Sequence, residues 1–306
     1  MAERILQDIA EQKKRLAIAQ INENTAEKAS AYCDLGEAYY FVSDFHQAVE
    51  YLKQYLSIAE EVGDRAGSAG RAYAILGSAH DSLGDSQRAI EYHNQELRIA
   101  KEVGDRAGEG CAYGHLGGTY YRLKEFQRAI EYLNQHLSIA KEEVGNREYE
   151  GKAYHNLGLV YNSLVEFQRA IEYYNQELII AKEVGDREGQ GKAYLHLGKT
   201  YHSLNEFQRA IEYTNKYLRI AKEVGDRAGE GRAHGILGAT YHSLNEFQRA
   251  IEYYNQCLRI AKEVGDRAVE GLTYGILGTT YHSLNEFQRA IEYHNQHLRI
   301  AEEVGD

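Results

Sequence analysis

Hydrophobic positions recur along the chain in blocks of about 40 residues. A Leu-Gly pair marks each block, and successive pairs are 40 or 41 residues apart. A period of this length is typical of repeat architectures in which each unit is one supersecondary element. The marking leucines are Leu35, Leu76, Leu116, Leu157, Leu197, Leu237 and Leu277.

The block 227–266 predicts two helices joined by a short turn. Ala233, Leu237 and Tyr241 are four residues apart, which gives one apolar stripe on a helix over about 227–243. The polar pair Asn245-Glu246 forms the turn. A second helix over about 247–263 carries an apolar face made of Phe247, Ala250, Ile251, Tyr254, Leu258 and Ala261.

Glycine and aspartate mark the ends of these helices. Gly265 suits the left-handed residue that ends a helix, and Asp266 is placed to cap the next one. A glycine inside a helix costs about 1 kcal/mol relative to alanine, so Gly238 needs a structural reason. We expect a close approach of the paired helix at that position.

The second helix of each block is apolar on more than one side. Tyr253, Ile260 and Val264 lie away from the stripe described above, so the helix must be covered on both flanks. A single block cannot bury such a helix alone, and stability has to come from stacking between neighbours. The fold class is therefore predicted to be all-α, an α-solenoid of helix-turn-helix repeats.

The repeat boundaries follow from this period. Residues 1–24 match a second helix alone, and we expect them to cap the first repeat. The chain stops at a repeat boundary, so we expect an uncovered apolar flank on the last helix, which indicates a fragment or a further capping segment that is missing here. Self-association through this uncapped end is a further expectation. The seven repeats are expected at 25–64, 65–105, 106–146, 147–186, 187–226, 227–266 and 267–306.

These residues resemble the tetratricopeptide repeat family. Its pattern appears here as Leu237, Gly238, Tyr241, Ala250 and Tyr254. The linker GDRAGEGRAH at 225–234 and the motifs LG, EF and AIEYHNQ are similar to the LGN/Pins group of G-protein-signalling modulators, which are cell-polarity scaffolds. The period is 40 rather than 34, the proline after the second helix is absent, and so is the asparagine ladder of LGN. The resemblance implies a right-handed superhelix whose concave groove, lined by the first helices, binds an extended peptide.

Composition narrows the class of partner. The net charge is -11 and the pI is near 5.7, which argues against nucleic acid as a partner. No apolar run approaches the roughly 18 residues that span a bilayer, so we expect no membrane insertion. Cys33, Cys111 and Cys257 are odd in number and far apart, which favours a reducing, cytoplasmic setting.

The resemblance also implies which side chains face the groove. Four of the seven residues that lie five positions before the leucines are basic, within an acidic protein. Such a stripe would attract an acidic peptide. The alternative is that these bases pair with Glu109, Glu150 or Glu230 on the same helices. The expected groove residues are Arg71, Tyr121, Arg122, Lys152, His155, Asn162, Lys192, Lys199, His202, Arg232 and His242.

Neither a catalytic nor a metal site is expected. Nearly every polar group recurs each 40 residues, whereas catalysis needs a unique environment. His202, His242 and His282 form a ladder, but equivalent residues are separated by two helix layers of roughly 8–10 Å each, too far apart to share one zinc ion. We therefore expect a non-enzymatic scaffold for protein interactions, without cofactors or metals. The alternative is a structural spacer or a rod that self-associates end to end, because repeats five to seven are nearly identical.

Overall fold

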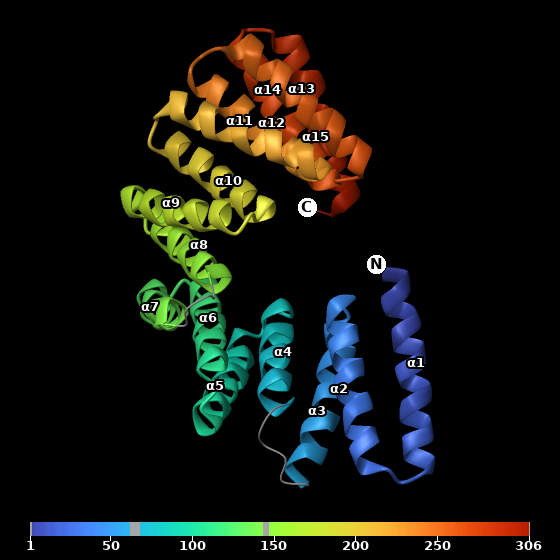
Figure 1. Ribbon diagram of the computed structural model, residues 1–306. Helices are drawn as coiled ribbons and strands as arrows, with labels where there is room; N and C mark the ends of the chain where they lie inside the picture. Colours follow the sequence, from blue (N-terminus) through green and yellow to red (C-terminus); the bar gives the residue numbers. More distant parts are fainter. Residues whose placement is uncertain (1, 62–67, 143–146, 306) are drawn as a thin grey trace. The chain divides into compact units, whose positions relative to one another are not determined.

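The chain folds entirely into helices over the residues that the structure describes. A computed structural model describes residues 2–61, 68–142 and 147–305, and all regular elements in these ranges are α-helices (Figure 1). Two compact units divide the chain at residues 156 and 157, inside α8. None of the helices in these ranges is long and apolar enough to cross a membrane.

The helices alternate between the two kinds that the sequence predicts, here called A and B. The A helices are α2 (Thr25–Phe41), α4 (Ser68–Ser82), α6 (Arg106–Arg122), α8 (Arg147–Ser163), α10 (Arg187–Ser203), α12 (Arg227–Ser243) and α14 (Arg267–Ser283). The B helices are α3 (Phe45–Glu61), α5 (Ser86–Val103), α7 (Phe126–Glu142), α9 (Phe167–Glu183), α11 (Phe207–Val224), α13 (Phe247–Val264) and α15 (Phe287–Val304), preceded by α1 (Ala2–Ile21).

Each helix packs against its neighbours in chain order. In the first unit α1 to α7 contact one another in succession, and in the second unit α9 to α15 do the same. The A helices of consecutive repeats also touch, as α2 with α4, α4 with α6 and α10 with α12. This is a helical solenoid, as predicted. The predicted repeat boundaries after 64 and after 146 lie outside the described residues.

The helix ends confirm the expected capping. Gly265 ends α13 in the left-handed region, with φ at +74°. Asp266 begins α14, and its carboxylate accepts a hydrogen bond from the Val269 amide at 3.0 Å. Asp105, Asp186 and Asp226 cap their helices in the same way. Each cap satisfies an amide that would otherwise lack a partner at the start of an A helix.

The Leu-Gly pair lies where the A and B helices of one repeat meet. Leu237 is fully buried, as are its six equivalents. A Cβ added at Gly238 would lie 2.6 Å from the ring of Tyr254 on α13. Glycine is required at position 238 because the ring of Tyr254 occupies the space that the methyl group of an alanine would need. The close approach expected from the sequence is therefore confirmed.

A tyrosine pair joins the two helices of nearly every repeat. Tyr241 on α12 stacks on Tyr253 of α13, with ring centroids 5.3 Å apart. Stacked aromatic pairs stabilise by about 0.5–1.5 kcal/mol beyond the area that they bury. In the second repeat His80 takes the place of the first tyrosine and stacks on Tyr92. The equivalent tyrosine pairs are 39/51, 120/132, 161/173, 201/213 and 281/293.

The B helices are covered on both flanks, except at the last repeat. On α13, Ile251 and Leu258 are 7% and 8% exposed because α12 and α14 lie on either side. Their equivalents on α15, Ile291 and Leu298, are 55% and 57% exposed. The difference shows how much of the burial of a B helix comes from the next repeat.

Two adjacent glycines of α6 test this account of the Leu-Gly pair. A Cβ at Gly117 would lie 2.6 Å from Leu133 Cγ, whereas a Cβ at Gly118 would meet nothing within 4 Å. We expect Gly117→Ala to lower the free energy of unfolding by about 1–3 kcal/mol through overpacking. Gly118→Ala should raise it by up to about 1 kcal/mol through helix propensity. Urea unfolding followed by circular dichroism measures both, and equal effects of the two substitutions would contradict the packing argument.

Candidate functional site

All the predicted groove residues lie on A helices. Arg71 is on α4, and Tyr121 and Arg122 are at the end of α6. On α8, Lys152 and His155 belong to the first unit and Asn162 to the second. The remaining predicted residues lie on two A helices of the second unit: Lys192, Lys199 and His202 on α10, and Arg232 and His242 on α12.

In the first unit the predicted arginines pair with acids of the preceding repeat. The guanidinium of Arg71 lies 2.6 Å from a Glu37 carboxylate oxygen. The Arg122 guanidinium pairs with Asp81, whose side chain is buried. These pairs bridge neighbouring A helices, α2 with α4 and α4 with α6. The arginine ends of both pairs are exposed and stay accessible, although the carboxylates are largely buried.

The positions at the ends of the A helices bridge neighbouring repeats in the second unit as well. Asn162 on α8 accepts a hydrogen bond from the Thr200 hydroxyl at 3.0 Å. His202 Nδ1 lies 3.2 Å from the Thr240 hydroxyl oxygen. Position 162 and its equivalent 202 therefore connect each A helix to the next one.

The ladder histidines pack on aromatic rings of their own repeats. His202 packs on Phe207, His242 on Phe247 and His282 on Phe287, with ring centroids 5.2–5.7 Å apart. Burial lowers the pKa of His202 and of His242. Both imidazoles are therefore neutral at pH 7 in the free protein.

Basic side chains gather on α10 and α12. Lys192 pairs with Glu188 at 2.7 Å on the same helix, and Arg232 pairs with Asp226 at 3.3 Å. Partial burial lowers the pKa of Lys199, and the nearby positive charge of Arg232 lowers it further. Two like charges near each other on neighbouring A helices make a local positive potential.

The carboxylates named in the alternative interpretation have other partners. Glu109 pairs with Arg106, Glu150 with Arg147 and Glu230 with Arg227, each at three residues' separation in the first turn of an A helix. The expected pairing of the wall bases with these three acids is therefore wrong. The physical reason is that residues three apart face each other on a helix, as Arg147 and Glu150 do. Residues two apart, such as Glu150 and Lys152, lie on different faces.

The α8 lysine does pair within its own helix. Lys152 Nζ lies 2.7 Å from Glu148, and it also lies over the Tyr149 ring, 5.2 Å from its centroid. Both the lysine and its glutamate are exposed, which limits the strength of the pair. His155 is half-buried one turn further along the helix.

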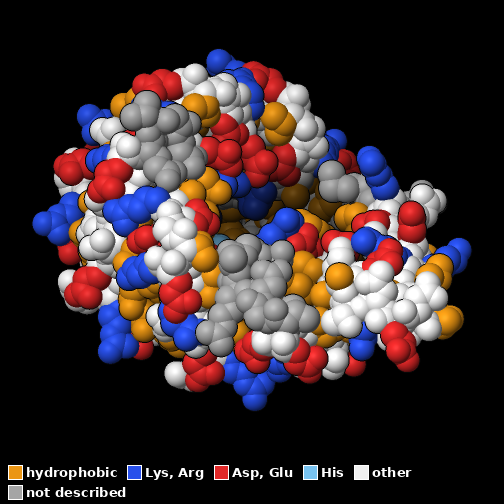
Figure 2. Space-filling view, turned by 60° about the horizontal axis from the view of Figure 1, so that its bottom comes forward, with side chains coloured by type: hydrophobic (Ala, Val, Ile, Leu, Met, Phe, Trp, Pro, Cys, Tyr) orange, Lys and Arg blue, Asp and Glu red, His pale blue; other side chains and the backbone are white. Residues whose placement is uncertain are grey.

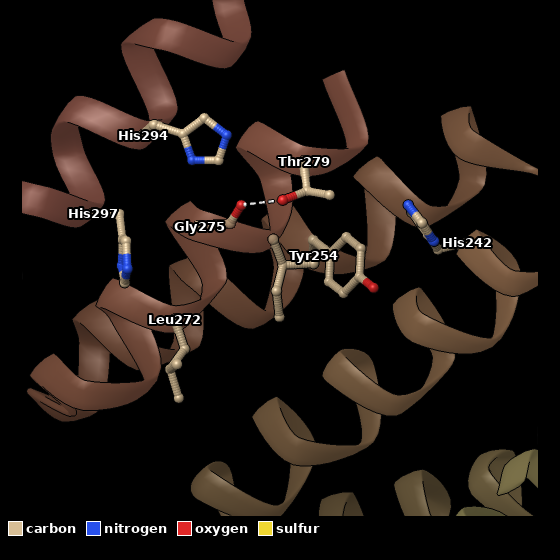
Figure 3. A pocket seen from close by; sticks show the side chains of 8 residues that line it. His242, Tyr254, Leu272, Gly275, Thr279, His294 and His297 are labelled. Carbon is tan, nitrogen blue, oxygen red and sulfur yellow. Dashed lines mark hydrogen bonds between the residues drawn. The ribbon is translucent and has the colours of Figure 1, made fainter. Parts of the chain in front are cut away.

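An apolar cavity of about 400 Å³ opens beside α14 in the second unit. Its lining side chains come from α12, α13, α14 and α15, and Figure 3 shows them around the cavity. Leu272 and Ile276 lie on its wall and are 61% and 41% exposed. The ring of Tyr254 lies between α12 and α14. His242, which is one of the predicted groove residues, also lines the cavity. Gly275, Thr279, His294 and His297 complete the lining.

The sequence analysis did not identify this cavity. Its signal is present in the sequence, because residues 272 and 276 are leucine and isoleucine where earlier repeats carry mostly polar residues at the first position. Gly275 leaves room between them. The predicted groove residues are all charged, polar or aromatic, so this aliphatic surface was not among them.

Charge over the visible face is mixed. Figure 2 shows Lys and Arg side chains interspersed with Asp and Glu, with hydrophobic side chains in small groups between them. A surface of this kind suits local recognition by a few side chains better than attraction by one broad potential.

Solved structures with the same architecture include regulators of several kinds. The apo quorum sensor NprR from B. thuringiensis matches with a TM-score of 0.77 at 16% identity, covering 96% of this chain and 83% of that one. The apo form of RapI has a TM-score of 0.71 at 15% identity, with coverages of 91% and 99%. A signal transduction ATPase with a tetratricopeptide repeat sensor, from Pyrococcus horikoshii, has a TM-score of 0.77 at 19% identity, covering 99% of this chain and 48% of that one.

Identities this low establish the fold and nothing further. No curated protein matches the sequence at a significant level. A family model for the tetratricopeptide repeat matches residues 27–102, 68–142, 149–223 and 229–303, which together span most of the chain. With helix pairs, Leu-Gly contacts and stacked repeats in agreement, the chain belongs to the tetratricopeptide repeat family.

Proposed function

We propose that this protein is a non-catalytic scaffold that binds an extended acidic peptide segment of a partner protein on the A-helix wall of the second unit. The observation that carries the proposal is that Lys192, Lys199 and Arg232 lie on α10 and α12, two A helices that contact each other. An acidic side chain between them would relieve their repulsion. The resemblance of the linkers to the LGN/Pins group supports an extended ligand, without identifying its sequence.

The apolar cavity beside α14 adds a second element of recognition. Leu272 and Ile276 expose apolar surface next to His242, which lies on the same wall as the basic residues. A peptide that places an acidic residue at Lys199 and a large apolar residue in this cavity would gain both charge and burial. NprR, which shares the fold, is a quorum sensor. The three free cysteines support a cytoplasmic setting.

The charge requirement can be tested with a defined probe. A fluorescein-labelled peptide of glutamates and alanines with one central leucine should bind, and salt should weaken the binding. We expect Lys192→Gln, Lys199→Gln and Arg232→Gln together to weaken it about 5- to 100-fold, at about 1 kcal/mol or less for each exposed charge. Fluorescence anisotropy measures the affinity.

The control for this experiment changes net charge by the same amount elsewhere. Arg219, Arg259 and Arg299 are exposed on B helices, and all three can be changed to Gln. Equal weakening by the two triple variants would contradict the wall assignment. A probe in which alanine replaces the central leucine measures the contribution of the cavity.

The same probe should bind more tightly in mild acid. Burial lowers the pKa of His202 and of His242, so both gain a proton only below the ordinary value near 6.5. Each protonation adds a positive charge beside an acidic ligand, so affinity should rise as the pH falls from 7 towards 5.5. His202→Gln with His242→Gln should remove this rise, and an unchanged pH profile in that double variant would exclude these histidines.

Self-association is a second candidate, favoured by the exposed flank of α15. Ile291 and Leu298 are more than half exposed, whereas the same positions on α13 are buried by the next repeat. A second copy of the chain could cover this flank as a further repeat does. We therefore propose end-to-end association as the alternative to peptide binding.

Light scattering after size-exclusion chromatography tests this alternative. If it holds, the mass will rise with protein concentration, and Ile291→Lys with Leu298→Lys will return it to that of the monomer. Ile179→Lys with Val184→Lys is the matched control, since both residues are exposed apolar positions on or beside α9. A constant monomer mass in the unchanged chain would rule out self-association.

A further inference from the structure

One group of side chains in the first unit departs from the pattern of the other repeats. His93 and Glu96 lie on α5, and His115 lies on α6 of the next repeat. His93 and Glu96 are 1% and 5% exposed, so both are fully enclosed. Among the histidines, cysteines, aspartates and glutamates that the structure describes, these three form the group whose ligand atoms are close enough together to hold a metal ion.

The three side chains converge on one carboxylate oxygen. Glu96 Oε2 lies 3.1 Å from His93 Nδ1 and 3.0 Å from His115 Nδ1. The three ligand atoms all lie within 4.8 Å of one another. Ligands at 2.0–2.2 Å from a tetrahedral zinc ion are about 3.3 Å apart, so the two nitrogen–oxygen distances already match such a site.

A second carboxylate orients His93 from behind. Asp81 Oδ2 lies 3.7 Å from His93 Nε2, the nitrogen that points away from Glu96. Asp81 is itself held by the Thr119 hydroxyl at 2.5 Å and by Arg122. A carboxylate behind a histidine is the arrangement that fixes the tautomer of a metal ligand and makes it more basic.

Asp81 also carries an unsatisfied atom. Its Oδ1 is buried and has no hydrogen-bond partner among the described residues. Burying an unsatisfied carboxylate oxygen is costly, so its retention here calls for a positive charge nearby. Arg122 supplies one such charge at Oδ2, and a divalent ion beside His93 would supply another.

We propose that His93, Glu96 and His115 bind one divalent transition-metal ion, with zinc as the expected occupant, and that Asp81 positions His93 for it. Two imidazoles and one carboxylate suit zinc and exclude hard cations such as magnesium, which prefer oxygen ligands alone. Three protein ligands leave one position for water. His115 has a 39% exposed side chain, so an ion can enter past it from solvent.

The other repeats provide an internal comparison. The positions of His93, Glu96 and His115 are occupied by Leu52, Tyr55 and Ile75 in the repeat before, and by Leu133, His136 and Asn156 in the repeat after. The nearest match in the second unit is Tyr174, Glu177 and His196. Tyr174 stacks on His196 with centroids 5.1 Å apart, close to the 4.9 Å between His93 and His115. That set has the same shape but lacks the first ligand.

Zinc titration of the full chain, after removal of metals with a chelator, tests the proposal. Isothermal titration calorimetry should show one tight zinc ion per chain, which excess magnesium does not displace. Glu96→Gln should abolish this binding, and Asp81→Asn should weaken it about 10- to 100-fold. Glu177→Gln is the matched control and should leave it unchanged. Cobalt substituted for zinc should give the visible absorption of a four-coordinate site.

Two further variants decide the case if Glu96→Gln fails to fold, as judged by circular dichroism. His115→Asn changes a partly exposed side chain and should abolish the tight site with the helical content intact. Tyr174→His should complete the second set and raise the stoichiometry from one zinc ion to two. Zinc binding that survives both Glu96→Gln and His115→Asn, or the absence of a tight site in the unchanged chain, would overturn the proposal.

Discussion

The structure depends on the burial of each B helix between two A helices. A fully buried leucine or isoleucine contributes about 1.5–3 kcal/mol relative to an exposed one. On α13, Ile251 and Leu258 obtain this burial from α14, because their equivalents on α15 are more than half exposed. Ile260 and its equivalent Ile300 are instead buried against the A helix of their own repeat. Stability therefore depends on both the pairing of helices within a repeat and the stacking of neighbouring repeats. The Leu-Gly contact serves this packing, because it fixes how closely the A helix approaches the residue that faces it from the B helix.

The same constraint decides where recognition can take place. B helices such as α13 pack against A helices on two sides, whereas A helices also contact A neighbours, as α4 contacts α2 and α6. The residues at the ends of the A helices connect repeats, as Asn162 does with Thr200 and Arg122 with Asp81. The residues proposed to face the peptide are thus the same as, or adjacent to, residues that join repeats. A substitution that removes such a contact would alter the stacking of repeats as well as the proposed binding.

The sequence was sufficient for the fold because its signals are periodic and local. The Leu-Gly spacing, the two apolar stripes and the Gly-Asp caps each predict a helix boundary or a contact by themselves, and α12 begins and ends at the predicted residues. Partners of charged side chains were harder to predict. Lys152 and Lys192 pair with acids four residues earlier, as helix geometry permits, but Arg71 reaches Glu37 in the preceding repeat. That contact depends on how adjacent A helices are placed, which a single repeat does not encode.

The chemistry that the sequence analysis missed lies where a repeat departs from its equivalents. His93 replaces an apolar or aromatic core residue of most repeats, and Glu96 and His115 are unremarkable until α5 and α6 bring them together. A comparison of equivalent positions considers each residue within its own helix. It does not detect such a group, because the group forms only across the boundary between two repeats. In a solenoid the unit that carries chemistry is therefore the interface between a B helix and the next A helix. When the residues of this interface are aligned, rather than those of one repeat, Tyr174, Glu177 and His196 fall at the positions of His93, Glu96 and His115. The alignment therefore identifies both groups.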